Sequence, residues 1–166
     1  MAPASAAARH RPAAVVTTMA LLVFLGVSAV FGGIELTFGL SATHMFPADW
    51  LDRVPLIDSW VLPGLVLGIG FGIGSLVVAY GMLRRPRWGW LAPAELATGQ
   101  HWSWAATIGL GLGQVVWILL ELVYLPGVSS LQVVYGGVGA ALVVLPALPS
   151  ARHHLRRSQQ GGAFEP

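Results

Sequence analysis

Four long apolar stretches, separated by charged or Pro- and Gly-rich segments, constrain this chain more than any other feature. They cover residues 13–40, 60–83, 102–124 and 128–145. At a rise of about 1.5 Å per residue, a helix over each stretch is about long enough to cross a hydrocarbon layer roughly 30 Å thick. The sequence therefore predicts an all-α fold, a polytopic transmembrane four-helix bundle.

Composition supports a membrane protein and leaves no room for a separate soluble domain. Of the 166 residues, 55% are apolar and only 10% are charged, against about 25% charged in soluble domains. The mean hydropathy is +0.72. We expect a transmembrane domain over residues 13–149, a disordered tail over 1–12 and a disordered basic tail over 150–166.

The arginines predict which way the bundle faces. Only Arg53 lies in the segments that join the first span to the second and the third to the fourth. The other eight lie before the first span, in the middle loop or after the fourth span: Arg9, Arg11, Arg84, Arg85, Arg87, Arg152, Arg156 and Arg157. The positive-inside rule then places both termini in the cytoplasm, with the lipid bilayer as the main partner. Because the basic residues are sorted by side, the chain has no nucleic-acid-binding face.

Composition predicts the source of the chain, and the first span has two interpretations. The absence of Lys and the Ala-rich termini indicate a high-GC bacterium, and hence its cytoplasmic (inner) membrane. Arg9 and Arg11, followed by an apolar run and by Val27-Ser28-Ala29, also fit a cleavable signal peptide. The run continues to residue 40, which favours an uncleaved helix, and cleavage stays the alternative.

Small residues recur at helical spacing in the last three spans and predict close helix packing. We expect this packing at Gly64, Gly68, Gly72, Gly109, Gly113 and Gly136. In lipid such faces let backbones approach closely and gain van der Waals contact. Packing within the bundle is the favoured interpretation, and a homo-oligomer or a larger membrane complex is the alternative.

The chain lacks the residues that several kinds of chemistry require. The chain has no Cys, and its five His residues all lie outside the predicted spans. Quinone-linked disulfide chemistry and a bis-His haem within the membrane are therefore excluded. No ionisable side chain lies near the bilayer midplane, and no Gly-rich phosphate loop or HExxH motif occurs. We expect no cofactor and no catalytic activity.

Polar residues near the outer ends of three spans form one candidate ligand-binding site. The site residues are Glu35 of the first span, Gln114 and Glu121 of the third, and Gln132 and Tyr135 of the fourth. Helical spacing puts Gln114 and Glu121 on one face of their span. Two other interpretations stay open: the glutamates reach headgroup water and the glutamines join helices, or Glu35, Glu121 and His44 bind a metal, although their spacing matches no ligand motif.

One stretch resembles a known group of membrane proteins. Residues 55–65, with Pro55, Asp58 and Pro63-Gly64, resemble the pattern P-[FL]-x-D-x-x-x-P-G-L, with one additional residue between Asp58 and Pro63. That pattern is found in small four-helix bacterial membrane proteins that are loosely called DoxX-like. Gly32-Gly33 and residues 131–136 are similar to the same group. Because the group has no established activity, the resemblance implies four spans and no reaction.

Three functions are compatible with these features. The first expectation is a non-enzymatic accessory or structural subunit, based on the glycine faces. The second is transport or binding of a cation or small polar ligand through the outer-half pocket. The third is a lipid-modifying enzyme, for which only His44 and the outer carboxylates could act as a general base.

Overall fold

The fold was analysed in a computed structural model, which describes residues 12–39, 48–55, 57–86 and 88–155. Its elements, all helical, follow one another along the chain. They are α1 (Ala13–Phe38), η1 (Ala48–Arg53), α2 (Val61–Leu65), η2 (Val66–Ile73), α3 (Gly74–Arg84), η3 (Gly89–Leu91), α4 (Ala92–Thr98), α5 (Trp102–Tyr124), α6 (Ser130–Ala147) and α7 (Pro149–Leu155).

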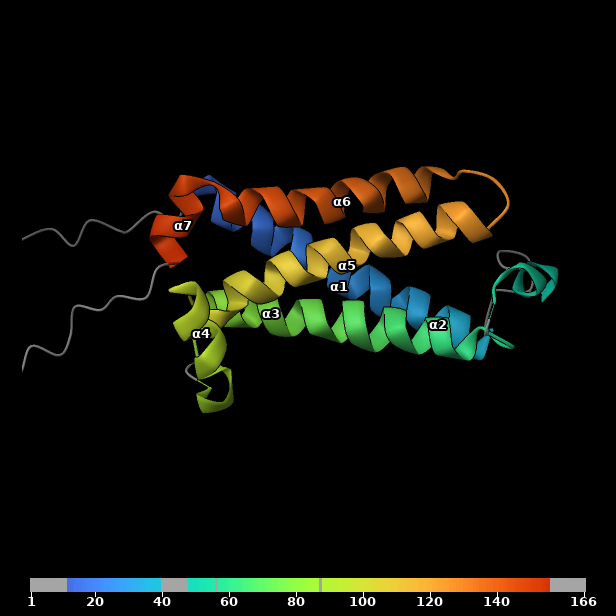
Figure 1. Cartoon of the computed structure of the whole chain (residues 1–166), viewed down its shortest axis with the longest axis horizontal. Helices are drawn as coiled ribbons and strands as arrows, with labels where there is room; N and C mark the ends of the chain where they lie inside the picture. Colours follow the sequence, from blue (N-terminus) through green and yellow to red (C-terminus); the bar gives the residue numbers. More distant parts are fainter. Residues whose placement is uncertain (1–11, 40–47, 56, 87, 156–166) are drawn as a thin grey trace, which may run out of the picture.

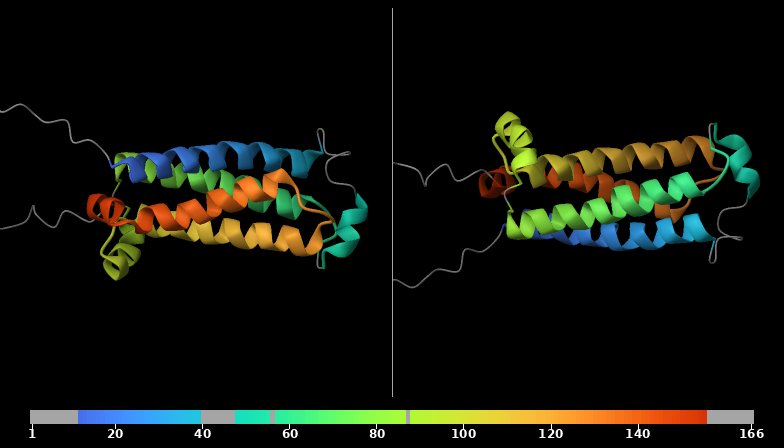
Figure 2. Two further views of the ribbon diagram at one scale, coloured as in Figure 1. Left: turned by 90° about the horizontal axis from the view of Figure 1, so that it is seen from above. Right: turned by 90° about the horizontal axis from the view of Figure 1, so that it is seen from below.

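Four rods cross the molecule side by side (Figures 1 and 2). They are α1, the continuous α2–η2–α3 segment over Val61–Arg84, α5 and α6, and each is long and apolar enough to span a membrane. These bounds lie within two residues of the predicted spans. The four-span, all-helical prediction is confirmed for the described residues, and the side of the membrane on which the ends lie stays a prediction.

The rods form a closed ring. In this ring α1 packs along α2–η2–α3, α3 packs on α5, α5 packs on α6, and α6 returns to α1. Both η1 and the α5–α6 turn lie at one end, which we call the η1 end. The start of α1, α4 and α7 lie at the other, which we call the α4 end (Figure 1).

The bundle is apolar outside and carries polar groups inside. Leu22, Leu25 and Leu142 fill its centre, together with buried Thr18 and Thr107. Each threonine hydroxyl donates to the carbonyl four residues earlier, which satisfies it within its own helix. The outward faces expose large apolar side chains such as Phe31 and Val133. This distribution suits a lipid environment.

Glycines set the closest helix contacts. A Cβ at Gly33 would lie 2.5 Å from Cα and N of Gly68 and 2.6 Å from the Gly64 carbonyl oxygen. Gly72 packs on the backbone of Val30 in the same seam, so Gly64, Gly68 and Gly72 all face α1. In this seam the backbones of α1 and α2–η2 touch directly.

The α5–α6 contact uses a different glycine from the one expected. A Cβ at Gly111 would lie 2.8 Å from the Gly139 carbonyl oxygen, whereas a Cβ at Gly109 would meet no described atom within 4 Å. Gly109 is therefore not a packing residue within the bundle, because the α5 face that meets α6 is rotated away from it. Gly113 faces the Phe71 ring, and Gly136 contacts Ile118 at ordinary distance.

Two local features differ from the sequence prediction. The second rod is π-helical over Val66–Ile73, where glycine alternates with large apolar residues. The C-terminal segment, which we expected to be disordered from residue 150, begins as a helix, because Pro149–Leu155 form α7. Residues 156–166 lie outside the described residues. Trp104 Nε1 donates to the Pro146 carbonyl oxygen at 2.9 Å and ties the start of α5 to the end of α6. Residues 1–11 of the predicted N-terminal tail lie outside the described residues.

Candidate functional site

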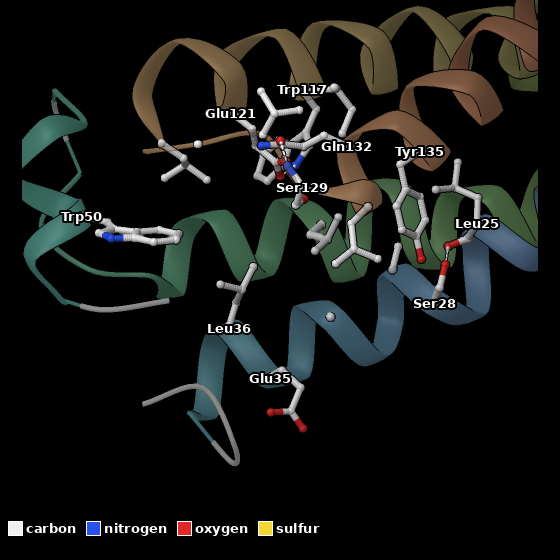
Figure 3. Close-up of a pocket in the computed structure, with 18 of the residues that line it drawn as sticks. Leu25, Ser28, Glu35, Leu36, Trp50, Trp117, Glu121, Ser129, Gln132 and Tyr135 are labelled. Atoms are coloured by element: carbon white, nitrogen blue, oxygen red, sulfur yellow. Dashed lines mark hydrogen bonds between the residues drawn. The ribbon is translucent and has the colours of Figure 1, made fainter. Parts of the chain in front are cut away.

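A pocket of about 490 Å³ opens between α1, α5 and α6 at the η1 end (Figure 3). Its walls are mostly apolar, with Leu36 and Leu67 on one side and the α5–α6 turn on the other. Pockets of this size and character bind small organic molecules, with a few polar groups fixing orientation. The polar side chains that line it are Ser28, Glu35, Glu121, Ser129, Gln132 and Tyr135.

Glu121 is the centre of the polar group. It lies on the last turn of α5, and Trp117, one turn earlier on the same face, donates its indole N–H to Glu121 Oε1 at 2.6 Å. The amide of Gln132 from α6 also hydrogen-bonds the carboxylate. A carboxylate offers about four acceptor positions. Two donors hold Glu121 in place and leave it able to accept from a ligand.

Gln132 is itself fixed by the helix terminus that carries it. The Ser129 N–H donates to Gln132 Oε1 at 2.9 Å, which is one half of a capping box at the start of α6. With its oxygen engaged there, Gln132 has its amide N–H groups available for Glu121. The N-terminus of α6 thus positions one of the donors that hold the carboxylate.

Aromatic rings line the same pocket. Trp50 from η1 and Tyr135 from α6 line the pocket together with Trp117. Tyr135 stacks on Phe24 of α1 with ring centroids 5.8 Å apart, and Phe71 meets Trp117 edge-on at 5.9 Å. The faces of such rings attract cations. The pocket therefore combines an acidic group with aromatic walls.

The structure brings together some, but not all, of the predicted site residues. Glu121, Gln132 and Tyr135 line one pocket. Glu35 is also at its rim, but Figure 3 shows its carboxylate pointing away from Glu121. Gln114 is buried nearly two turns further from the η1 end than Glu121 and is not a lining residue. The two carboxylates therefore line the same pocket but do not point toward each other.

The charges of the lining residues, and the arrangement of possible metal-binding side chains, indicate which class of ligand suits the pocket. The charged side chains that line it are Glu35 and Glu121, both acidic. Within the described residues, no group of three or more His, Cys, Asp or Glu could hold a metal ion. His44, the third member of the predicted metal set, lies outside these residues. An acidic, mostly apolar pocket of this volume suits an organic cation better than a bare ion.

A second polar cluster lies at the α4 end. His101 Nδ1 lies 2.9 Å from Ser103 Oγ, and His101 Nε2 lies 3.8 Å from Glu95 Oε1. Burial lowers the pKa of His101 below 6.5, and the nearby Arg85 acts in the same direction, whereas the Pro86 carbonyl and Glu95 oppose the shift. Trp88 stacks on Trp102 at 4.9 Å beside this cluster. These contacts hold residues 88–101 against the bundle.

Sequence reasoning missed Ser129 as a residue of the pocket. Ser129 precedes Gln132 by three residues, which is the spacing of a capping box and could have revealed the start of α6. The Pro-Gly pair of Leu125-Pro126-Gly127 indicates a tight turn, but the place of this turn in the pocket wall depends on how the helices pack.

Comparisons with protein-family models, with curated proteins and with solved structures find no match for this chain. The resemblance to the DoxX-like group therefore stays a prediction, and the argument for function depends on the pocket.

Proposed function

We propose that this chain is a multi-pass membrane protein that binds a small organic cation in the pocket at the η1 end. The observation that carries the proposal is the carboxylate of Glu121, which two donors hold inside an aromatic and mostly apolar cavity. Glu121 is half-buried, and partial removal of a carboxylate from water is costly unless a cation or hydrogen-bond donors compensate it. An ammonium group on an apolar body would supply the missing positive charge and fill the remaining volume.

The orientation of the bundle in the membrane determines the side from which the ligand enters. At the α4 end the described arginines are Arg84, Arg85 and Arg152, and at the η1 end the described arginine is Arg53. The positive-inside rule then supports a cytoplasmic α4 end and a pocket that opens outward in a bacterial inner membrane. The chain has no native Cys. In intact cells, a membrane-impermeant maleimide should label Asp58→Cys but not Ser150→Cys, and the reverse pattern would overturn this orientation.

Binding of a matched pair of probes tests the proposed function. Octylamine, charged at neutral pH, should bind the purified protein in nanodiscs at least about tenfold more tightly than octanol, because a hydrogen bond to a charged group adds roughly 1.5–3 kcal/mol. Isothermal titration calorimetry, with empty nanodiscs subtracted, measures both affinities. Equal affinity for the two probes, or saturable binding of neither, would contradict the proposal.

The accessory-subunit role has weaker support. It was based on the glycine faces, and Gly64, Gly68 and Gly72 face α1 within the same chain. These residues are therefore not available to a second protein. The ligand-binding role uses residues that the fold holds in one cavity, so we place it first.

A further inference from the structure

Gln114 is a buried polar residue that the pocket does not explain. Its side chain is only 2% exposed, and its Oε1 has no hydrogen-bond partner. Two other buried side-chain oxygens in the described residues share that property, Ser75 Oγ and Gln100 Oε1. Buried acceptors are rarely left unsatisfied, so an unpartnered one marks a place where a ligand or water could donate.

Of the three, Gln114 is the one aligned with the pocket. It precedes Glu121 by seven residues, or nearly two full helical turns, so both side chains lie on the same face of α5. The rise between them is about 10 Å. Ile118 lies between them on that face and lines the pocket, as does Leu25 of α1. Gln114 therefore lies directly beyond the inner wall of the cavity.

Helix α6 lies close to Gln114 because it has a glycine opposite this side chain. A Cβ at Gly139 of α6 would lie 3.2 Å from the Gln114 Cβ, so α6 approaches closely there only because residue 139 has no side chain. Ile118 and Leu25 line the inner part of the pocket, on the side of Gln114. Ile118 is branched at Cβ and stiff in a helix, whereas a rotamer change of Leu25 on ligand binding would extend the cavity along α5.

We propose that the ligand is an elongated amphiphile with two different polar ends. Its cationic end binds Glu121, and a neutral hydrogen-bond donor, such as a hydroxyl, reaches Gln114 about 10 Å deeper along α5. The deeper end is neutral because the Gln114 amide carries no charge to compensate a second one, and burial of an unpaired charge is costly. This inference rests on the proposed function of the pocket and defines the class of its ligand.

A series of alkyl amines tests the proposal. Aminooctanol, with an amine and a hydroxyl at opposite ends, should bind several-fold to tenfold more tightly than octylamine, because it satisfies the Gln114 oxygen. Diaminooctane should lose this advantage, since its second end is charged. Aminobutanol, which is too short to span the two groups, should show no gain over butylamine. Calorimetry in nanodiscs, with empty nanodiscs subtracted, gives these ratios.

Substitutions separate this inference from the proposed function. Gln114→Met keeps the length of the side chain and removes the amide, so it should abolish the preference for aminooctanol while octylamine binds as in the wild type. Ser75→Ala, which removes another unpartnered buried oxygen, should keep the preference. A folding check by thermal unfolding accompanies each variant, with Gln114→Leu as a second variant if the first is unstable.

The possible failures are distinguishable. If octylamine and aminooctanol bind the wild type equally, the two-ended ligand is wrong and the cation site stands. If Gln114→Met keeps the preference, Gln114 is not the second contact and the inference is overturned. If no amine binds at all, the proposed function itself fails.

Discussion

Replacing Glu121 by glutamine should lower the affinity for octylamine by about 10- to 100-fold. The amide has nearly the same shape as the carboxylate and still accepts from Trp117 Nε1, which lies 2.6 Å from Oε1 in the wild type. The substitution removes the negative charge and one of the two acceptor oxygens, so the contact with Gln132 is also weakened. A charge-assisted hydrogen bond is worth roughly 1.5–3 kcal/mol, which corresponds to that range of affinity. Calorimetric titration of octylamine into the Glu121→Gln protein measures the loss.

Glu35 provides the matched control in the same pocket rim. Its carboxylate points away from Glu121 (Figure 3), so Glu35→Gln should change octylamine affinity by less than about threefold. Octanol should bind all three proteins alike, because it carries no charge. An equal loss in both variants would mean that a general acidic surface attracts the amine. No loss in Glu121→Gln would remove the cation site altogether.

Replacing Gly33 by alanine should reduce the free energy of unfolding by about 2–3 kcal/mol. The added Cβ would lie 2.5 Å from Cα and N of Gly68 and 2.6 Å from the Gly64 carbonyl oxygen. These are backbone atoms, which cannot rotate out of the way, so α1 must separate from the second rod. The separation forfeits the van der Waals contact that joins helices in lipid. Unfolding by increasing dodecyl sulfate in mixed micelles gives the free energy.

Gly109→Ala is the corresponding control, since a Cβ there would meet no described atom within 4 Å. Its unfolding free energy should stay within about 0.5 kcal/mol of the wild type or rise slightly, because alanine favours a helix. If Gly33→Ala proved as stable as Gly109→Ala, the glycine seam would not determine the packing of α1.

The spans and their order could be predicted because the signals that define them are local. Apolar runs of membrane length fix α5 at residues 102–124, as predicted, and the other rods within two residues. Proline and glycine near the ends of the runs mark where helices begin and stop. Gly39, for example, ends α1 in the left-handed conformation that glycine adopts readily.

The candidate site could be predicted only in part, because it depends on how each helix is rotated about its axis. Spacing along α5 places Gln114 and Glu121 on one face, but it does not show that Ile118 separates the first from the cavity. Glu35 shares a helix with Ser28, yet its side chain points to the other side of the rim. These rotations are set by glycine contacts between helices, and a single sequence does not show which glycines meet.

The placement of the chain ends has a practical consequence for experiments on living cells. The described chain enters α1 and leaves α7 at the α4 end, across the whole bundle from the pocket (Figure 1). A fluorescent protein or an affinity handle joined beyond either helix would therefore leave the cavity mouth unobstructed. In contrast, the 125–129 turn forms part of the cavity wall, so epitopes inserted there would report on a damaged site. Tags for imaging or for affinity capture of the intact protein should therefore be joined before α1 or after α7.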